Sequence, residues 1–214
     1  MATICATGTS LGNSSRPRHD ESSPPKLDLA PGVILDIVVS HVESSQAIIV
    51  QPLIYKRWLE KLTKGMDELY LQLDPDDLPL PPEILVGAGD LFAAKYPADG
   101  HWYRAKLVSR LSPSKLLVRY VDYGNMGEVV LSQAKKLLRK WQIQPIMSIP
   151  CSSGSLRNVD HNLLRAYLLQ GQHLTIVLGS AKNDGSWEAN FFRLDHTVPA
   201  AGEVNVAADF IGRA

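Results

Sequence analysis

The feature that most constrains the fold is a series of short apolar segments separated by turn signals in the middle of the chain. Four segments rich in β-branched and aromatic residues are separated by "PADG", "SPS" and "YGNMG". Strands this short and this closely spaced are typical of a small, strongly bent antiparallel barrel. We therefore predict strands at residues 90–96, 102–111, 115–122 and 128–131.

Before this barrel, the sequence predicts a β-hairpin and one amphipathic helix. Residues 33–42 and 47–53 are rich in β-forming residues, and Ser44-Ser45 lies at the turn between them. Apolar residues at three- and four-residue steps then predict one face of a helix. These residues are Trp58, Leu62, Met66, Leu69 and Leu73. The proline-rich stretch 74–83 ends the helix and makes an extended connection, because proline lacks the N–H that a helix needs.

After the barrel, the sequence predicts two helices, a strand pair and a closing helix. Residues 132–141 are expected to form a helix with Ser132 as its cap. A second helix is expected to begin at the cap Asp160 and to stop at Gly171. Its inward face would carry Leu163, Leu164, Tyr167 and Leu168. Two strands joined through "KNDG" follow, and a short helix is expected to begin at Asn205.

Neither flank looks complete alone, because the first contains too few strands for a stable sheet. We therefore expect a β-rich α+β fold in which one module is split in sequence and the small barrel is inserted into it. The expected organisation is a flexible tail over residues 1–30, a first part of the split module with its linker helix over 31–83, the barrel over 84–131 and a second part over 132–214. The tail is rich in Ser, Thr, Pro and Gly, a composition that does not build a core.

Two stretches of the expected barrel place polar aromatic residues near strand ends. "AKYPADGHWYRAKLV" has Tyr96 and Tyr103 on either side of a turn, and "VRYVDYGNMGEV" has Tyr120 and Tyr123 at the end of a strand. Rings at strand ends can converge at a barrel rim, but ordinary packing with surface hydroxyls is the alternative. Trp102 is expected in the core, on the face opposite its neighbour, because adjacent residues on a strand point in opposite directions.

Composition and charge narrow the function classes. The 22 basic and 22 acidic residues cancel, which removes the electrostatic case for binding bulk nucleic acid. The two cysteines form no C-x-x-C or Cys/His cluster, so we expect no structural zinc, and the pattern suits a reducing intracellular compartment. No apolar run is long enough to span a bilayer, and the first residues lack the features of a secretory signal.

No constellation of catalytic residues is recognisable in the sequence. Asp74, Asp76 and Asp77 lie in the proline-rich linker, which is a poor rigid platform for a metal ion. Three histidines have no visible nucleophile partner: His161, His173 and His196. We therefore expect no enzymatic activity, no cofactor and no metal, since a fold alone does not supply a function.

The stretches "GDLFAAKYPADGHWYRAKLV" and "LLVRYVDYGNMGEV" resemble a Tudor domain. The flanks resemble the two halves of the staphylococcal-nuclease-like, OB-type fold that surrounds Tudor in the extended Tudor arrangement. The resemblance covers about residues 33–214, and the motifs W-Y-R-A and D-Y-G-N at this separation make it specific. The chain is thus similar to germline Tudor-domain proteins and to Tudor–staphylococcal-nuclease proteins.

This resemblance implies a non-catalytic reader of methylated arginine, above all symmetric dimethylarginine, in Arg-Gly or Arg-Ala peptides. The implied ligands include tails of PIWI-clade Argonautes, which would make the chain an adaptor of the piRNA pathway in the cytoplasm and in perinuclear germ granules. Carried over by position, the aromatic cage would be Tyr96, Tyr103, Tyr120 and Tyr123, with Asn125 as the polar contact of the guanidinium. One departure is the "PADG" turn, which is a residue longer than in some relatives and bears on where Tyr96 lies.

The chemistry of such a ligand explains these residue types. A dimethylated guanidinium keeps its charge but is bulkier and less hydrated, and each cation–π contact contributes about 0.5–2 kcal/mol. After the entropy of ordering a flexible peptide, this predicts micromolar affinity. Asn125 would accept a hydrogen bond from a remaining N–H. Asp122 would orient its neighbours, add negative potential or make a structural hydrogen bond, and Arg104 would brace the structure with its charge reaching water or an acidic partner.

The sequence also leaves two alternative functions open. The OB-type half would bind single-stranded RNA by stacking bases on aromatic rings, although the neutral charge counts against this. The second alternative is a protein scaffold that recognises unmodified or methyl-lysine peptides.

Overall fold

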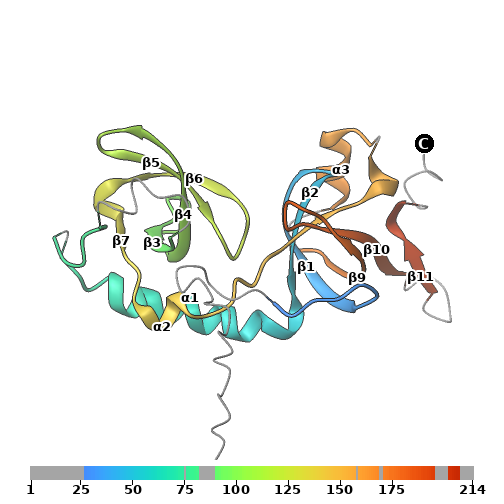
Figure 1. Cartoon of the computed structure of the whole chain (residues 1–214), viewed down its shortest axis with the longest axis horizontal. Coiled ribbons are helices and arrows are strands. Elements are labelled where there is room, and N and C mark those ends of the chain that lie inside the picture. Colours follow the sequence, from blue (N-terminus) through green and yellow to red (C-terminus); the bar gives the residue numbers. More distant parts are fainter. Residues whose placement is uncertain are drawn as a thin grey trace, which may run out of the picture.

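The structure is a computed structural model that describes residues 27–74, 76–81, 90–157, 159–168, 171–195 and 202–207. These residues form two β lobes, with the helix α1 (Lys56–Tyr70) running beneath both (Figure 1). In the part of the chain that is described, no helix has the length and apolar character needed to cross a membrane. Residues 1–26 of the expected tail lie outside the described residues, while Leu27 and Leu29 pack against the core of one lobe.

The first lobe is a five-stranded sheet in the order β6-β5-β4-β3-β7, curled into a small barrel. Its strands are β3 (Phe92–Lys95), β4 (Trp102–Ser112), β5 (Lys115–Tyr120), β6 (Met126–Val130) and β7 (Ala134–Lys136). The four predicted strands are confirmed within a few residues, and β7 is an additional one. The interior holds Phe92, Ala94, Ala105, Leu116, Val118, Tyr120, Val129 and Ala134. Trp102 points the other way and lies in the core against α1, as predicted.

The helix predicted over residues 132–141 is wrong. The chain instead forms a 3-10 turn at Leu131–Gln133, the strand β7 and the one-turn helix α2 (Arg139–Gln142). Lys135 explains the difference: it is 3% exposed, and its ammonium donates to the carbonyl oxygens of Asp74 at 2.9 Å and Asp77 at 2.7 Å. Tertiary contacts with distant residues therefore override the local helix propensity.

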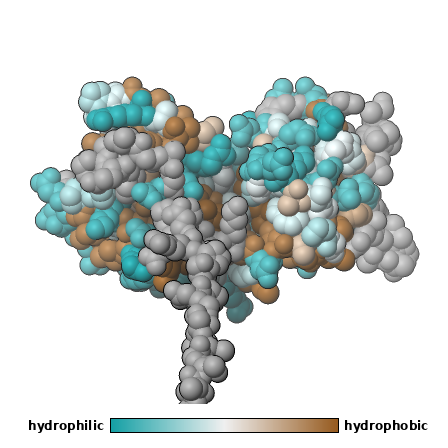
Figure 2. All heavy atoms as spheres, in the orientation of Figure 1, coloured by the Kyte–Doolittle hydropathy of each residue, from teal (hydrophilic) through white to brown (hydrophobic). Residues whose placement is uncertain are grey.

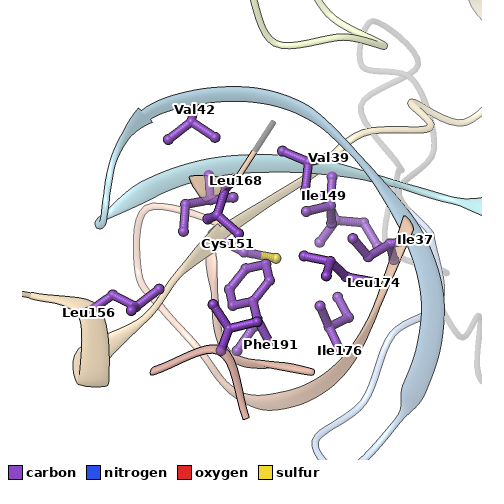
Figure 3. Packing of buried hydrophobic residues seen from close by; sticks show 14 of the residues in the cluster. Ile37, Val39, Val42, Ile149, Cys151, Leu156, Leu168, Leu174, Ile176 and Phe191 are labelled. Atoms are coloured by element: carbon purple, nitrogen blue, oxygen red, sulfur yellow. The ribbon is translucent and has the colours of Figure 1, made fainter. Parts of the chain in front are cut away.

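The second lobe combines segments from both ends of the chain. Its strands are β1 (Ile34–Ser44), β2 (Ala47–Pro52), β8 (Ile149–Ser152), β9 (His173–Ala181), β10 (Trp187–Asp195) and β11 (Gly202–Asn205). The sheet order is β11-β10-β8-β2-β1-β9, and β10 also pairs with β9, so the strands other than β11 close into a ring. Apolar side chains such as Ile37, Leu174 and Phe191 fill its centre (Figure 3).

The outcome for the flanking elements is mixed. The hairpin of β1 and β2 and the pair β9 and β10 are confirmed, whereas β8 and β11 were not predicted. Asn205 ends β11, and its side-chain oxygen accepts from the backbone N–H of Ala207 at 2.9 Å, so a helical turn does begin there. Residues 208–214 of the expected closing helix lie outside the described residues.

Helices α1 and α3 form as their apolar spacing predicts, but their buried residues are not in every case the expected ones. The buried residues of α1 are Leu59, Leu62, Met66 and Tyr70, while Trp58 and Leu69 are half-buried. In α3 (His161–Tyr167), the carboxylate of Asp160 accepts from two backbone N–H groups at 2.9 and 3.1 Å, which confirms the predicted cap. Leu164 is buried, but Leu163 is 57% exposed, so the inward placement predicted for Leu163 is wrong.

The turn that follows β5 joins the two lobes. The hydroxyl of Ser40 in β1 donates to the carbonyl oxygen of Tyr123 at 2.7 Å, and the side-chain amide of Gln51 in β2 donates to that of Asp122 at 2.5 Å. The hydroxyl of Ser148, just before β8, donates to the carbonyl oxygen of Val121 at 2.6 Å. The second lobe therefore fixes the backbone of the turn on which three predicted site residues lie.

Candidate functional site

Four tyrosine rings from three parts of the barrel converge at one rim. Tyr96 follows β3, Tyr103 lies in β4, Tyr120 ends β5 and Tyr123 lies in the turn after β5. The ring of Tyr103 packs edge-on against the other three, with centroid distances of 5.1 Å to Tyr123, 5.9 Å to Tyr120 and 6.3 Å to Tyr96. The rings of Tyr96 and Tyr120 are 5.0 Å apart. The structure thus brings all four predicted rings together.

The four rings are not equivalent. Tyr120 is 1% exposed, belongs to the barrel core and donates its hydroxyl to the carbonyl oxygen of Lys95 at 3.1 Å. Tyr96 and Tyr123 are half-buried. Tyr96 packs on Tyr103 and Tyr120, Tyr123 packs on Tyr103, and the described ring contacts include none between Tyr96 and Tyr123. Tyr96 and Tyr123 therefore suit the side walls of a small cage, and the other two suit its floor. For Tyr120, the geometry favours the alternative of ordinary packing beneath the other rings.

The turn after β3 sets the position of Tyr96 and orients Tyr103. It is closed by hydrogen bonds between the backbone of Tyr96 and those of His101 and Gly100, at 2.8 and 2.9 Å. Asp99 in this turn accepts from the backbone N–H of His101 at 2.9 Å and from the hydroxyl of Tyr103 at 2.8 Å. Asp99 is thus a positioning residue that the sequence reasoning missed.

The ionisation of these phenols is suppressed. Burial raises the pKa of the Tyr103 hydroxyl well above its ordinary value, and the hydrogen bond to Asp99 adds to the effect. Burial also raises the pKa of Tyr120 and of Tyr123, and for Tyr123 a hydrogen bond with Thr63 of α1 opposes the shift. Tyr103, Tyr120 and Tyr123 are therefore neutral at physiological pH, and the two that are half-buried, Tyr103 and Tyr123, offer uncharged aromatic rings to a ligand.

Asp122 lies beneath the rim and not on it. Its carboxylate, in a residue 2% exposed, accepts from Nε and Nη2 of Arg104 at 2.8 and 2.5 Å and from the backbone N–H of Met147 at 3.0 Å. Of the roles considered for Asp122, the geometry favours the structural one and leaves no oxygen facing a ligand. Arg104 is 1% exposed, so its charge is paired as expected but does not reach water.

Asn125 lies at the end of the same turn and is half-buried. Its carbonyl oxygen accepts from the backbone N–H of Tyr120 at 3.0 Å, which fixes its backbone beside the cage. Its side-chain amide makes no hydrogen bond with any of the described residues. The contact of this amide with a ligand stays a prediction.

An acidic groove leads away from the rings. A hollow of about 560 Å³ lies between α1 and the barrel and is lined by both Tyr103 and Tyr123. Three carboxylates of α1 line it, Glu60, Asp67 and Glu68, together with Lys64, whose ammonium lies 3.8 Å from the Glu68 carboxylate. Asp67 also holds the imidazole of His101 at 2.6 Å. A second hollow of about 260 Å³ between the lobes shares Tyr123 and Glu60 with the first. The sequence reasoning missed α1 here, because it considered only the apolar face of the helix.

Gly124 lies at a close contact between the turn after β5 and the second lobe. Its φ is +86°, and a Cβ there would lie 2.5 Å from Cγ1 of Ile49 in β2. We expect Gly124→Ala to lower the free energy of unfolding by about 2–4 kcal/mol, from backbone strain plus overpacking. Urea denaturation measures this loss.

The matched control is Gly185→Ala, which has a φ of +83° but no atom within 4 Å of its Cβ. We expect this variant to lose only about 1–2 kcal/mol from the left-handed backbone. Equal losses in the two variants would mean that the contact with Ile49 does not couple the lobes.

Comparison with known proteins places this geometry in a family. The family model of the Tudor domain matches residues 31–153. "Tudor domain-containing protein 1" of Danio rerio is 24% identical over 157 residues, which are 73% of this chain and 13% of the relative. The "Tudor and KH domain-containing protein" of Homo sapiens is 33% identical over 94 residues, 44% of this chain and 16% of the relative. The chain matches only a small part of the length of these relatives.

Solved structures match both lobes. The extended Tudor domain of human TDRD1, in complex with a symmetrically dimethylated peptide, has a TM-score of 0.76 at 24% identity, covering 91% of this chain and 94% of that one. The extended Tudor domain of BmPAPI in complex with sDMA has a TM-score of 0.70 at 20% identity, covering 85% of this chain and 97% of that one. At these identities the likeness concerns the fold.

Proposed function

The chain belongs to the Tudor domain family and has the fold of an extended Tudor domain, and from this premise we propose that it is a non-catalytic reader of methylated arginine. The preferred ligand is symmetric dimethylarginine in an Arg-Gly or Arg-Ala peptide. The observation that carries the proposal is the convergence of four tyrosine rings at the barrel rim, with the centroids of contacting rings 5.0–6.3 Å apart.

The site suits a methylated guanidinium better than an unmodified one. Unmodified arginine is held best by a carboxylate that accepts two parallel N–H bonds. The carboxylate of Asp122 is already used in this way by Arg104, and the two oxygens of Asp99 accept from the backbone N–H of His101 and the hydroxyl of Tyr103. Aromatic faces instead favour a bulkier, less hydrated cation. The carboxylates of the groove would attract a basic peptide. Each ion pair with an exposed carboxylate would add little to the affinity.

The partner that we propose is the arginine-methylated tail of a PIWI-clade Argonaute. The supporting parallels are a mouse TDRD1 domain in complex with a MILI peptide containing dimethylarginine, and a complex of Tudor with methylated (me2s) Aubergine. The chain would then be an adaptor in the piRNA pathway, in the cytoplasm and at perinuclear germ granules. We also propose that the second lobe is the OB-type, staphylococcal-nuclease-like half, which its closed ring of strands supports.

Titration calorimetry with a set of Arg-Gly peptides tests the proposal. The set contains one arginine in unmethylated, asymmetric and symmetric dimethylated forms, and a matching peptide with methyl-lysine. We expect micromolar affinity for the symmetric form and at least roughly tenfold weaker binding of the unmodified form. Equal binding of the unmodified peptide would overturn the reader function, and tightest binding of methyl-lysine would assign the cage to the other cation.

A further inference from the structure

Four basic side chains from both lobes lie around the junction between the lobes. They are Lys106 of β4, Arg119 of β5, His41 of β1 and Arg165 of α3, and we call them the basic row. In Figure 1, α3 and the β5–β6 part of the barrel lie on one side of the molecule and α1 on the other. Figure 2 shows hydrophilic residues on the second lobe's wall of the notch between the lobes on that side, and a mixture of hydrophilic and hydrophobic residues on the barrel's wall.

Two residues of the row lie together on the outer face of the barrel. Lys106 and Arg119 are directly opposite on β4 and β5, so their side chains share one face. This is the outer face, because the neighbouring Ala105 and Val118 point into the barrel core. Arg119 donates from Nη1 to the carbonyl oxygen of Gly124 at 3.1 Å. Its guanidinium is thereby held at the turn that contacts the second lobe.

The other two residues lie across that contact. Gly124 packs on Ile49 of β2, and Ile49 is the register partner of His41 in β1. A bulge after Val39 turns His41 outward, and α3, which carries the exposed Arg165, packs on β1. Burial lowers the pKa of His41, Arg165 and Arg119 lower it further, and Glu43 opposes them. The two arginines therefore flank His41 from different lobes.

Three of the four side chains of the row form no ion pair among the described residues, and Glu43 acts on the fourth, His41. Lys106, Arg119 and Arg165 make no ion pair with a carboxylate among the described residues. The acidic groove between α1 and the barrel holds carboxylates of the opposite sign. The net charge of zero thus conceals two regions of opposite charge on one molecule.

We propose that the basic row binds the phosphodiester backbone of single-stranded RNA. The surface around the row offers spaced cations and the exposed side chain of Met126 beside Arg119, whereas protein partners are usually held by aromatic anchors. Binding to phosphates needs only spaced cations that release counterions. The row shares the turn after β5 with the tyrosine cage through the bond from Arg119 to Gly124, but none of its four side chains is a cage ring, so one chain would hold a peptide and an RNA strand at the same time.

Fluorescence anisotropy with a short labelled oligouridine tests the site. With three or four contacts, we expect a slope of log affinity against log salt of about −2 to −3. The double variant Lys106→Glu/Arg165→Glu should bind roughly tenfold or more weakly at low salt. Arg57→Glu/Lys61→Glu makes the same charge change at exposed positions of α1 and should leave binding nearly unchanged. Affinity should also rise as the pH falls below 6.5, because protonated His41 adds a charge.

The outcomes separate this site from the methylarginine site. Lys106→Glu/Arg165→Glu should keep its affinity for the dimethylated peptide, and Tyr123→Ala should lose the peptide but keep RNA. No binding at low salt, or equal loss in both charge-reversal variants, would overturn the RNA site. Equal affinity for poly-glutamate would overturn the ligand class. If the double variant unfolds, Arg119→Gln serves instead, and unchanged RNA affinity in that variant would also overturn the proposal.

Discussion

Arg104→Met is expected to lower the free energy of unfolding by about 3–5 kcal/mol, because it leaves a buried carboxylate without its partner. The guanidinium donates to both oxygens of Asp122 and also to the carbonyl oxygens of Trp141, Gln144 and Pro145, at 3.0, 2.7 and 2.7 Å. One side chain therefore ties β4 and the turn after β5 to the segment that leads into β8. Urea denaturation measures the loss.

An exposed arginine of the same strand provides the control. Arg110 also donates to two backbone carbonyl oxygens, those of Ser112 and Pro113, but it is exposed and pairs with no buried charge. Arg110→Met should therefore change stability by no more than about 0.5 kcal/mol. If the two variants unfold at the same urea concentration, the buried ion pair of Arg104 does not stabilise the fold.

The elements that could be predicted are those whose signals are local. The barrel strands follow from alternating apolar residues between turn signals, and the cap at Asp160 follows from a side chain that bonds its own helix. The four tyrosines follow from their positions at strand ends. Their convergence depends only on the first and second hairpins of the barrel, which bring sequence neighbours together.

The elements that could not be predicted depend on distant partners. The strand β8 is four residues long and gains its hydrogen bonds from β2 and β10, which lie far away in sequence. Lys135 lies in a strand because its ammonium donates hydrogen bonds to the backbone carbonyl oxygens of residues 74 and 77. Asp122 looked like a ligand contact because it is next to Tyr123, yet adjacent residues point to opposite sides and Arg104 lies on the buried one.

Tyr123→Ala is expected to weaken binding of a symmetric dimethylarginine peptide by about 1–3 kcal/mol, or roughly tenfold to a hundredfold. Tyr123 forms one wall of the cage and is the only one of the four rings that also lines both hollows among the described residues. Its loss removes an aromatic face from the cation and opens the cage to water. Titration calorimetry with the dimethylated peptide measures the loss, and a melting curve of the variant establishes that it is folded.

Tyr123→Phe is the matched control for this prediction. It keeps the aromatic face and removes only the hydroxyl, whose hydrogen bond is with Thr63 of α1 and not with the cage. The phenol is neutral in the native protein, because burial raises its pKa, so no charge is lost with it. We therefore expect the phenylalanine variant to bind the peptide within about threefold of the original affinity, since cation–π attraction depends on the ring face. Equal losses in the two variants would show that the hydroxyl, and not the aromatic face, holds the ligand.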